Sequence, residues 1–192
     1  LDPGLLSDAF IDAAGEAGVT RASLGVQTFD PAVQARVNRV QPLDQVAAAT
    51  TRLRAAGVRA VNFDLMYGLP GQSPENVAAT AEAASQLRPD RVAVCGYAHV
   101  PWMKKHQVMI EEAELADSDA RWTQAEAADS VLRAGGYLRI GLDHLQRHRL
   151  IGVEGPGPGA AEPCDMAKAA KRLPKVTGDG ADIAALAADH LQ

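Results

Sequence analysis

The chain has 192 residues, of which 47% are hydrophobic and 22% are charged, and its formal net charge is −5. This composition is ordinary for a globular domain with its own core. The acidic balance argues against nucleic acid as a partner, and no apolar run reaches the ~20 residues of a membrane-spanning helix. There is no secretion signal pattern, and Cys95 and Cys164 are too far apart for metal-ligand spacing. Together these features favour a cytoplasmic protein.

Helix and strand patterns alternate along most of the chain, with glycine, proline and capping residues at their boundaries. Ser73 before Pro74 is typical of a helix start, and Gly18 and Gly57 stand where left-handed C-caps are expected. In chain order the patterns predict a helix over 3–17, a strand over 22–29, a short helix from 31, a helix over 45–56 capped by Asp44, a strand within 61–70, a helix over 74–87, a strand over 91–98, a helix near 107–112, a long helix from 117 or 118, and a strand over 137–142.

Such alternation implies parallel strands joined by right-handed helical crossovers. Four strands are too few to close an eight-stranded barrel, so the pattern predicts either part of a barrel or an open α/β sheet. We expect residues 1–145 to form this domain. Residues 146–192 contain a turn-rich Gly-Pro run, and we expect them to be a weakly ordered tail. Because Leu1 is directly followed by a helix pattern, we expect the chain to be a piece of a longer protein.

Polar side chains recur at the C-terminal ends of the predicted strands. Asn62 and Asp64 share one face of a strand whose other face is apolar, Gln27 ends the preceding strand, and Tyr97 and His99 end the next. Parallel α/β folds bind ligands at this edge, which makes it the candidate site. Structural interpretations stay open: Asp64 as a loop acid, Gln27 as a cap on a neighbouring loop, and His99 as a structural loop residue.

Other chemistry-bearing residues carry no distinct signal. Composition alone predicts that Arg39 is a solvated surface charge and that Cys95 is a packing residue. The sequence contains no nucleophile–base pair, phosphate-binding glycine loop, dinucleotide-binding fingerprint or zinc cluster. Physical reasoning therefore predicts an α/β domain with a polar ligand edge.

Five segments resemble, in order and spacing, the oxygen-independent coproporphyrinogen III oxidase family, whose members are radical S-adenosylmethionine enzymes. The segments are residues 23–29 (SLGVQTF), 37–39 (VNR), 64–70 (DLMYGLP), 97–101 (YAHVP) and 141–144 (GLDH). The GVQ and DLMYGLP motifs are shared with a related haem-chaperone branch, whereas VNR, YAHVP and GLDH favour the oxidase branch. Leu145 departs from the family pattern, in which an aromatic residue usually follows GLDH.

The resemblance implies a partial (β/α) barrel of parallel strands, incomplete at both ends, which holds S-adenosylmethionine at its C-terminal edge. Gln27, Arg39 and Asp64 match positions that contact this cofactor, and Ala98 matches a position that lines a second S-adenosylmethionine site. An amide and a carboxylate suit hydroxyl and amino groups, and an arginine suits a carboxylate.

The implied activity belongs to haem biosynthesis. In this family a [4Fe–4S] cluster reduces S-adenosylmethionine to a 5′-deoxyadenosyl radical, and the propionates of coproporphyrinogen III are oxidatively decarboxylated to the vinyl groups of protoporphyrinogen IX. The resemblance also implies a separate electron donor, which the sequence does not identify, and a monomeric cytoplasmic protein.

The sequence departs from the family in two respects. The cluster-binding Cys-x3-Cys-x2-Cys loop is expected upstream of Leu1, and neither Cys95 nor Cys164 can replace three closely spaced thiolates. We therefore expect the isolated chain to be inactive. The tail over 146–192 is expected to resemble nothing in the family and to reflect a shifted reading frame or a truncated gene. Two alternatives stay open: a haem chaperone of the related branch, and a non-catalytic S-adenosylmethionine-binding half-barrel.

Overall fold

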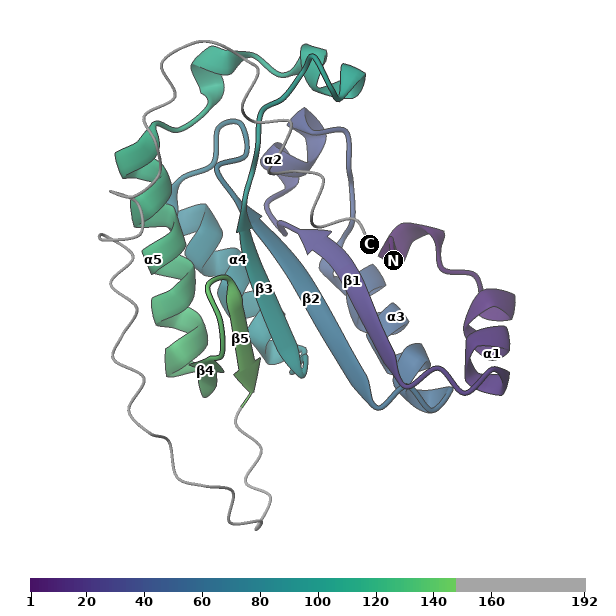
Figure 1. The fold of residues 1–192 in the computed structure, drawn as a ribbon. Helices are drawn as coiled ribbons and strands as arrows, with labels where there is room; N and C mark the ends of the chain where they lie inside the picture. The colour runs from purple at the N-terminus through teal and green to yellow at the C-terminus, as the bar shows by residue number, and fades with distance from the viewer. Residues whose placement is uncertain (148–192) are drawn as a thin grey trace. The chain divides into compact units, whose positions relative to one another are not determined.

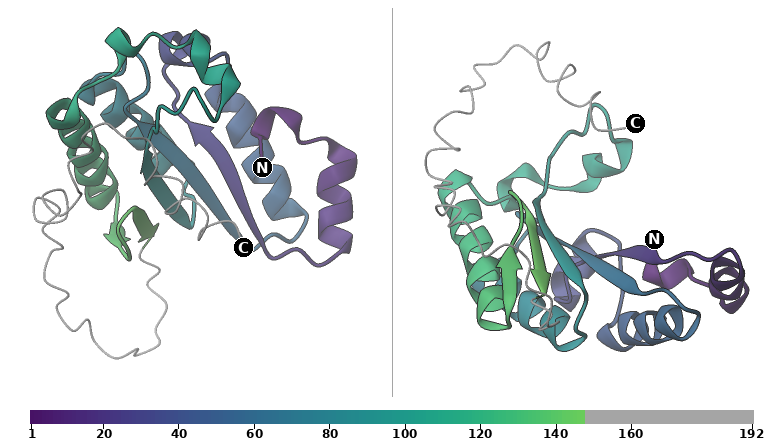
Figure 2. Two further views of the ribbon diagram at one scale, coloured as in Figure 1. Left: turned by 45° about the horizontal axis from the view of Figure 1, so that its top comes forward. Right: turned by 60° about the horizontal axis from the view of Figure 1, so that its bottom comes forward.

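The computed structural model describes residues 1–147, apart from the side chain of His106. Helices and strands alternate through most of this range, and Figures 1 and 2 show them in three orientations. In chain order the elements are the 3₁₀ helix η1 (Pro3–Leu5), α1 (Asp8–Glu16), β1 (Arg21–Gln27), α2 (Pro31–Arg36), α3 (Leu43–Ala55), β2 (Ala60–Tyr67), α4 (Pro74–Gln86), β3 (Arg91–Gly96), the 3₁₀ helices η2 (Lys105–Met109) and η3 (Glu112–Glu114), α5 (Ser118–Ala134), β4 (Tyr137–Arg139) and β5 (His144–Arg147).

The strands form one five-stranded sheet in the order β1-β2-β3-β5-β4. β1, β2 and β3 are parallel neighbours, and helices connect them in sequence, as the alternating pattern predicted. The α/β class with parallel strands is therefore confirmed. None of the helices in the described part has the length and apolar character that membrane crossing requires.

The predicted strand over 137–142 is wrong in its length and in its neighbour. β4 has only three residues, and the chain then reverses, with the Ile140 N–H donating to the His144 carbonyl at 2.9 Å. The returning strand β5 lies between β3 and β4 and is antiparallel to both. A four-residue strand is too short to show a period of two in sequence, which is why it was missed. β5 includes Gln146 and Arg147 from the predicted tail; the rest of that tail lies outside the described residues.

Three helix predictions also need correction. Ser7 accepts the Phe10 N–H and so divides the predicted 3–17 helix into η1 and α1. Asp44 is not the N-cap of α3, because the helix starts at Leu43, two residues earlier than predicted, and Pro42 occupies the N-cap position. The helix predicted near 107–112 is replaced by the two short 3₁₀ helices.

Several capping predictions are confirmed. Ser73 and Asn76 form a reciprocal capping box at the start of α4, and Asp117 accepts a backbone N–H at the start of α5. Gly18 and Gly57 have φ of +72° and +96°, the left-handed region expected after a helix. These local signals fix where the helices begin and end, and thereby where the strands enter the sheet.

The two faces of β2 are sharply different. Val61, Phe63 and Leu65 are at most 3% exposed and belong to the main core, into which α3, α4 and α5 also pack residues. Burial of such side chains contributes about 1.5–3 kcal/mol each. The intervening Asn62 and Asp64 are only partly buried. The sheet thus has one apolar face under helices and one polar face available for a site.

Tyr137 couples the stability of β4 to pH. Its side chain is 1% exposed, and its hydroxyl donates to the Pro89 carbonyl at 2.9 Å. Burial raises the pKa of Tyr137 from 10.0 to about 12. Because the folded pKa exceeds the unfolded one, the associated stability is fully present below pH 10.0 and is lost as the pH rises through about 12.

We therefore expect the free energy of unfolding to fall between pH 10 and 12, and Tyr137→Phe to flatten that fall. The variant should also lose about 1 kcal/mol at neutral pH through the unpaired carbonyl. Urea unfolding of both proteins across this range measures the effect. If the free energy of unfolding fell equally in both proteins, the pH dependence would come from groups other than Tyr137.

Candidate cofactor-binding site

The candidate site lies on the polar face of the sheet, over β1 and β2. Both carboxylate oxygens of Asp64 lie within hydrogen-bonding distance of the Ser23 hydroxyl, at 2.9 and 2.8 Å. A hydroxyl has a single proton to donate, so the carboxylate keeps further acceptor capacity. Ser23 fixes the position of Asp64 and leaves it able to accept from a ligand.

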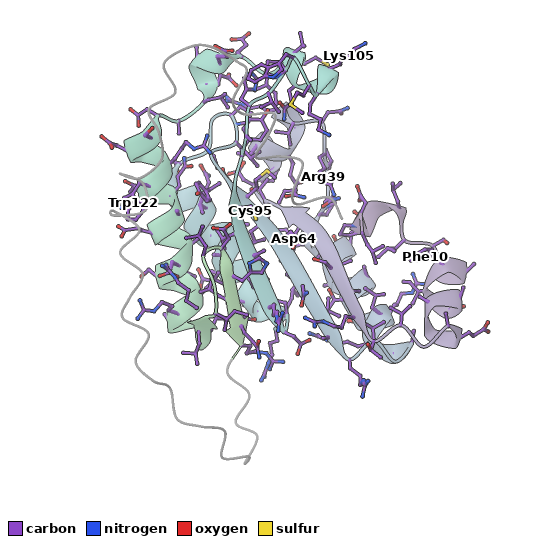
Figure 3. All side chains as sticks on the ribbon, viewed as in Figure 1. Phe10, Arg39, Asp64, Cys95, Lys105 and Trp122 are labelled. Atoms are coloured by element: carbon purple, nitrogen blue, oxygen red, sulfur yellow. The ribbon has the colours of Figure 1, made fainter. Side chains whose placement is uncertain are left out.

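Gly25 on β1 is the register partner of Asp64. A Cβ at Gly25 would lie 2.8 Å from the Gln27 Nε2 and 3.2 Å from the Arg39 Nη2. The missing side chain therefore allows the Gln27 amide and the Arg39 guanidinium to converge over the strand. Gln27 has φ of +65° at a register shift of β1, an unusual conformation that ends the strand at this point. Figure 3 shows Arg39 and Asp64 on this part of the sheet.

Arg39 is not the solvated surface charge that composition indicated. Its Nη2 donates to the Gly25 carbonyl at 2.9 Å and forms an ion pair with Asp2 at 3.1 Å. Its Nε is buried without a hydrogen-bond partner, as is Asn62 Oδ1 on the same face. Such atoms cost about 1–3 kcal/mol each unless something satisfies them. The site thus contains a carboxylate, an amide, a guanidinium N–H and a carbonyl oxygen, of which the last two are buried without hydrogen-bond partners.

Ala98 stands apart from this group. It lies beyond the end of β3, five residues after Ala93, which is the register partner of Asp64. Ala98 is exposed, and its carbonyl accepts from Gln107 Nε2 at 3.0 Å, while the Gln107 Oε1 accepts the Val100 N–H at 2.6 Å. The structure therefore brings Gln27, Arg39 and Asp64 together, and no described contact joins Ala98 to them.

Tyr97 and His99 have structural surroundings. Tyr97 packs with Val33 and Leu69 in a second, smaller core cluster, and burial raises its pKa. Its hydroxyl lies 3.1 Å from His99 Nδ1. These contacts support the structural interpretation of both residues.

Cys95 lies on β3 and is half-buried. Burial raises the pKa of its thiol, and the neighbouring Asp143 and Asp64 carboxylates raise it further. The thiol therefore stays protonated at neutral pH and is a weak nucleophile. Within residues 1–147, Cys95 is the only cysteine, and no three His, Cys, Asp or Glu side chains are grouped to hold a metal. This part of the chain does not fit a [4Fe–4S] cluster, and Cys164 lies outside it.

Arg121 on α5 was missed by the sequence analysis. Its Nη2 donates to the Tyr97 carbonyl at 2.6 Å, and its guanidinium carbon lies 5.9 Å from the centre of the Tyr67 ring. Its guanidinium group also fills the space that side chains at Gly68 and Gly96 would occupy. A Cβ added at these glycines would lie 3.2 and 3.0 Å from it, respectively. Arg121 thereby connects the C-terminal ends of β2 and β3.

Two buried glutamines fix the loop after β2. The Gly68 N–H donates to Gln124 Oε1 at 2.8 Å, and Gln124 Nε2 donates to the Gln72 carbonyl at 2.6 Å. The Gln72 side chain accepts the Leu69 N–H and donates to the Met66 carbonyl, both at 3.0 Å. These side chains satisfy the loop backbone and hold the edge of the candidate site in one geometry.

Residues 2–84 match the family model of the radical SAM superfamily. The oxygen-independent coproporphyrinogen III oxidase of Bradyrhizobium diazoefficiens is 48% identical over 147 residues, which is 77% of this chain and 33% of that protein. The enzyme of that name from Paracoccus denitrificans is 39% identical over 183 residues, which is 95% of this chain and 39% of that protein. The second match extends into residues 146–192 and so corrects the expectation that this tail resembles nothing in the family.

A solved structure agrees with these relatives. Coproporphyrinogen III oxidase from Escherichia coli, a radical SAM enzyme, is 35% identical with a TM-score of 0.73, and the match covers 77% of this chain and 34% of that one. The chain thus spans about a third of the length of the proteins that it matches. Residues 2–84 are thus similar to the radical SAM superfamily, and the chain is similar to part of the oxygen-independent coproporphyrinogen III oxidases.

Proposed function

We propose that this chain forms the S-adenosylmethionine-holding part of an oxygen-independent coproporphyrinogen III oxidase. The observation that carries the proposal is the convergence of Gln27 and Arg39 over Gly25, beside the carboxylate of Asp64. Buried polar atoms without partners, Arg39 Nε and Asn62 Oδ1, lie on the same face. A ligand that carries hydroxyl, amino and carboxylate groups satisfies this set.

Each side chain has a role that follows from its chemistry. Asp64, oriented by Ser23, accepts hydrogen bonds from hydroxyl or amino groups of the cofactor. Arg39 donates from Nε to the cofactor carboxylate, while its Nη2 stays bound to Gly25 and Asp2. Gln27 donates and accepts through its amide. Ala98, further along the same edge, lines the site of a second S-adenosylmethionine.

In the longer protein, Gln27, Arg39 and Asp64 would hold S-adenosylmethionine, which would supply hydrogen-abstracting chemistry at the propionate side chains of coproporphyrinogen III; formation of the vinyl groups with loss of carbon dioxide would also require a separate electron acceptor. Residues 1–147 contain no group of side chains that could hold the cluster. Their contribution to that reaction is therefore to bind and orient the cofactor. The reductant that serves the reaction, a monomeric state and a cytoplasmic location stay predictions of the family resemblance. The haem-chaperone alternative gains no support from the oxidase names of the relatives.

Asp64→Asn tests the cofactor site in the full 192-residue chain. We expect the variant to bind S-adenosylmethionine at least about tenfold more weakly, since hydrogen bonds to a charged group are worth about 1.5–3 kcal/mol. Isothermal titration calorimetry measures the affinity, and circular dichroism checks that the variant folds. Asp12→Asn, which removes an exposed acid from α1, is the matched control and should bind like the parent chain. Equal affinity of the two variants would contradict the role of Asp64.

A further inference from the structure

A second polar site lies at the other end of the parallel strands, before β2 and β3 begin. A hollow of about 330 Å³ opens there. Among the residues that the structure describes, its lining contains four arginines and one acid, in a chain whose net charge is −5. The residues are Arg54, Arg59, Arg88, Asp90 and Arg147.

Two of the arginines have structural partners. Arg54, in the last turn of α3, donates to the Leu87 and Arg88 carbonyls at 3.3 and 2.6 Å, where α4 ends. Arg147 forms an ion pair with Asp90 at 3.5 Å. The C-terminal ends of helices attract cations, so these contacts explain the position of Arg54.

The other donors of the hollow include the side chains of Arg59 and Arg88, both of which are exposed. The side chains of Arg59 and Arg88 form no hydrogen bond or ion pair with any residue of the described range, and Arg147 Nε is buried without a partner. Within residues 1–147, four arginines and one carboxylate line the hollow, and Asp90 also accepts the Val61 N–H at 2.9 Å. Like charges in close proximity destabilise each other, and a bound anion removes that repulsion.

We propose that this hollow binds a small phosphate-bearing anion. Guanidinium groups match phosphate oxygens in paired, parallel hydrogen bonds, and a phosphate group presents more acceptor oxygens to several arginines than a carboxylate does. The volume lies at the small end of the range for ligand pockets, about 300–1,000 Å³, which fits a phosphate or pyrophosphate group. The site is separate from the cofactor residues and does not depend on the proposed function.

The test is calorimetric titration of sodium pyrophosphate into the full chain and three variants. We expect saturable binding to the parent chain and about tenfold weaker binding to Arg59→Gln and to Arg88→Gln, since each loses a charge-assisted interaction. Lys104→Gln, which removes an exposed positive charge beyond the C-terminal end of β3, should bind like the parent. Arg59→Lys keeps the positive charge but loses the paired N–H donors of the guanidinium group, so its affinity for pyrophosphate should lie between those of the parent chain and Arg59→Gln. This variant also takes the place of Arg59→Gln if Arg59→Gln does not fold.

A parallel titration with ADP identifies the source of the phosphate. Tighter binding of ADP than of pyrophosphate supports the site and assigns it to nucleotides, whereas equal or weaker binding supports it as a site for inorganic phosphate groups. Absence of saturable binding to the parent chain overturns the proposal. So does binding by Arg59→Gln and Arg88→Gln that equals binding by Lys104→Gln. S-adenosylmethionine affinity should be unchanged in all variants, which keeps this result distinct from the Asp64 test.

Discussion

Gly25→Val is expected to weaken S-adenosylmethionine binding by about 100-fold while the chain stays folded. The new Cβ would lie 2.8 Å from the Gln27 amide, which must move, and 3.2 Å from the Arg39 guanidinium, which the added methyl groups of valine crowd further. Loss of two polar contacts to a charged ligand, at about 1.5 kcal/mol each, corresponds to about that factor. Valine favours strands, and Gly25 is not in the left-handed region, so the backbone of β1 accepts the change.

Calorimetric titration of the cofactor, with circular dichroism to confirm folding, measures this effect. Gly141→Val is the control, since a Cβ at Gly141 meets nothing within 4 Å and its φ is ordinary. Gln27→Ala should reproduce part of the loss, because it removes only one of the two displaced groups. A folded Gly25→Val variant with the parent affinity would show that the convergence over Gly25 has no part in binding.

The local features of the fold were accessible from sequence because their signals are local. Val61 and Phe63 alternate with Asn62 and Asp64, and this period of two correctly predicted an apolar face and a polar face on β2. Ser73 likewise predicted the start of α4 through its capping chemistry. Each signal depends on a few neighbouring residues, so it survives without knowledge of the tertiary structure.

Features that depend on distant contacts were not accessible in this way. Arg39 reaches back fourteen residues to the Gly25 carbonyl, and nothing in its local sequence distinguishes it from a surface arginine. Physical reasoning alone therefore misread it, and only the family resemblance assigned it to the cofactor. Arg121 and Gln124 were missed for the same reason: they satisfy backbone groups of other elements. β5 was missed because its pairing with β3 is visible only in the sheet.

Gln124→Leu is expected to lower the free energy of unfolding by about 2–6 kcal/mol. Leucine has a similar volume but leaves the Gly68 N–H and the Gln72 carbonyl unpaired, and each buried group without a partner costs about 1–3 kcal/mol. Gln124 is 1% exposed, so solvent does not reach the site to replace the lost bonds.

Urea unfolding at neutral pH measures this change, and Gln86→Leu, at an exposed position of α4, is the matched control with an expected change within about 0.5 kcal/mol. A loss below about 1 kcal/mol would mean that the loop over 68–72 rearranges and finds other partners. In the expected case, the amide of Gln124 ties the loop after β2 to α5, and the rigidity of the cofactor edge depends on a helix that contributes no ligand to it. In Gln124→Leu, cofactor affinity should then fall together with the free energy of unfolding. In Gly25→Val, cofactor affinity should fall while the chain stays folded.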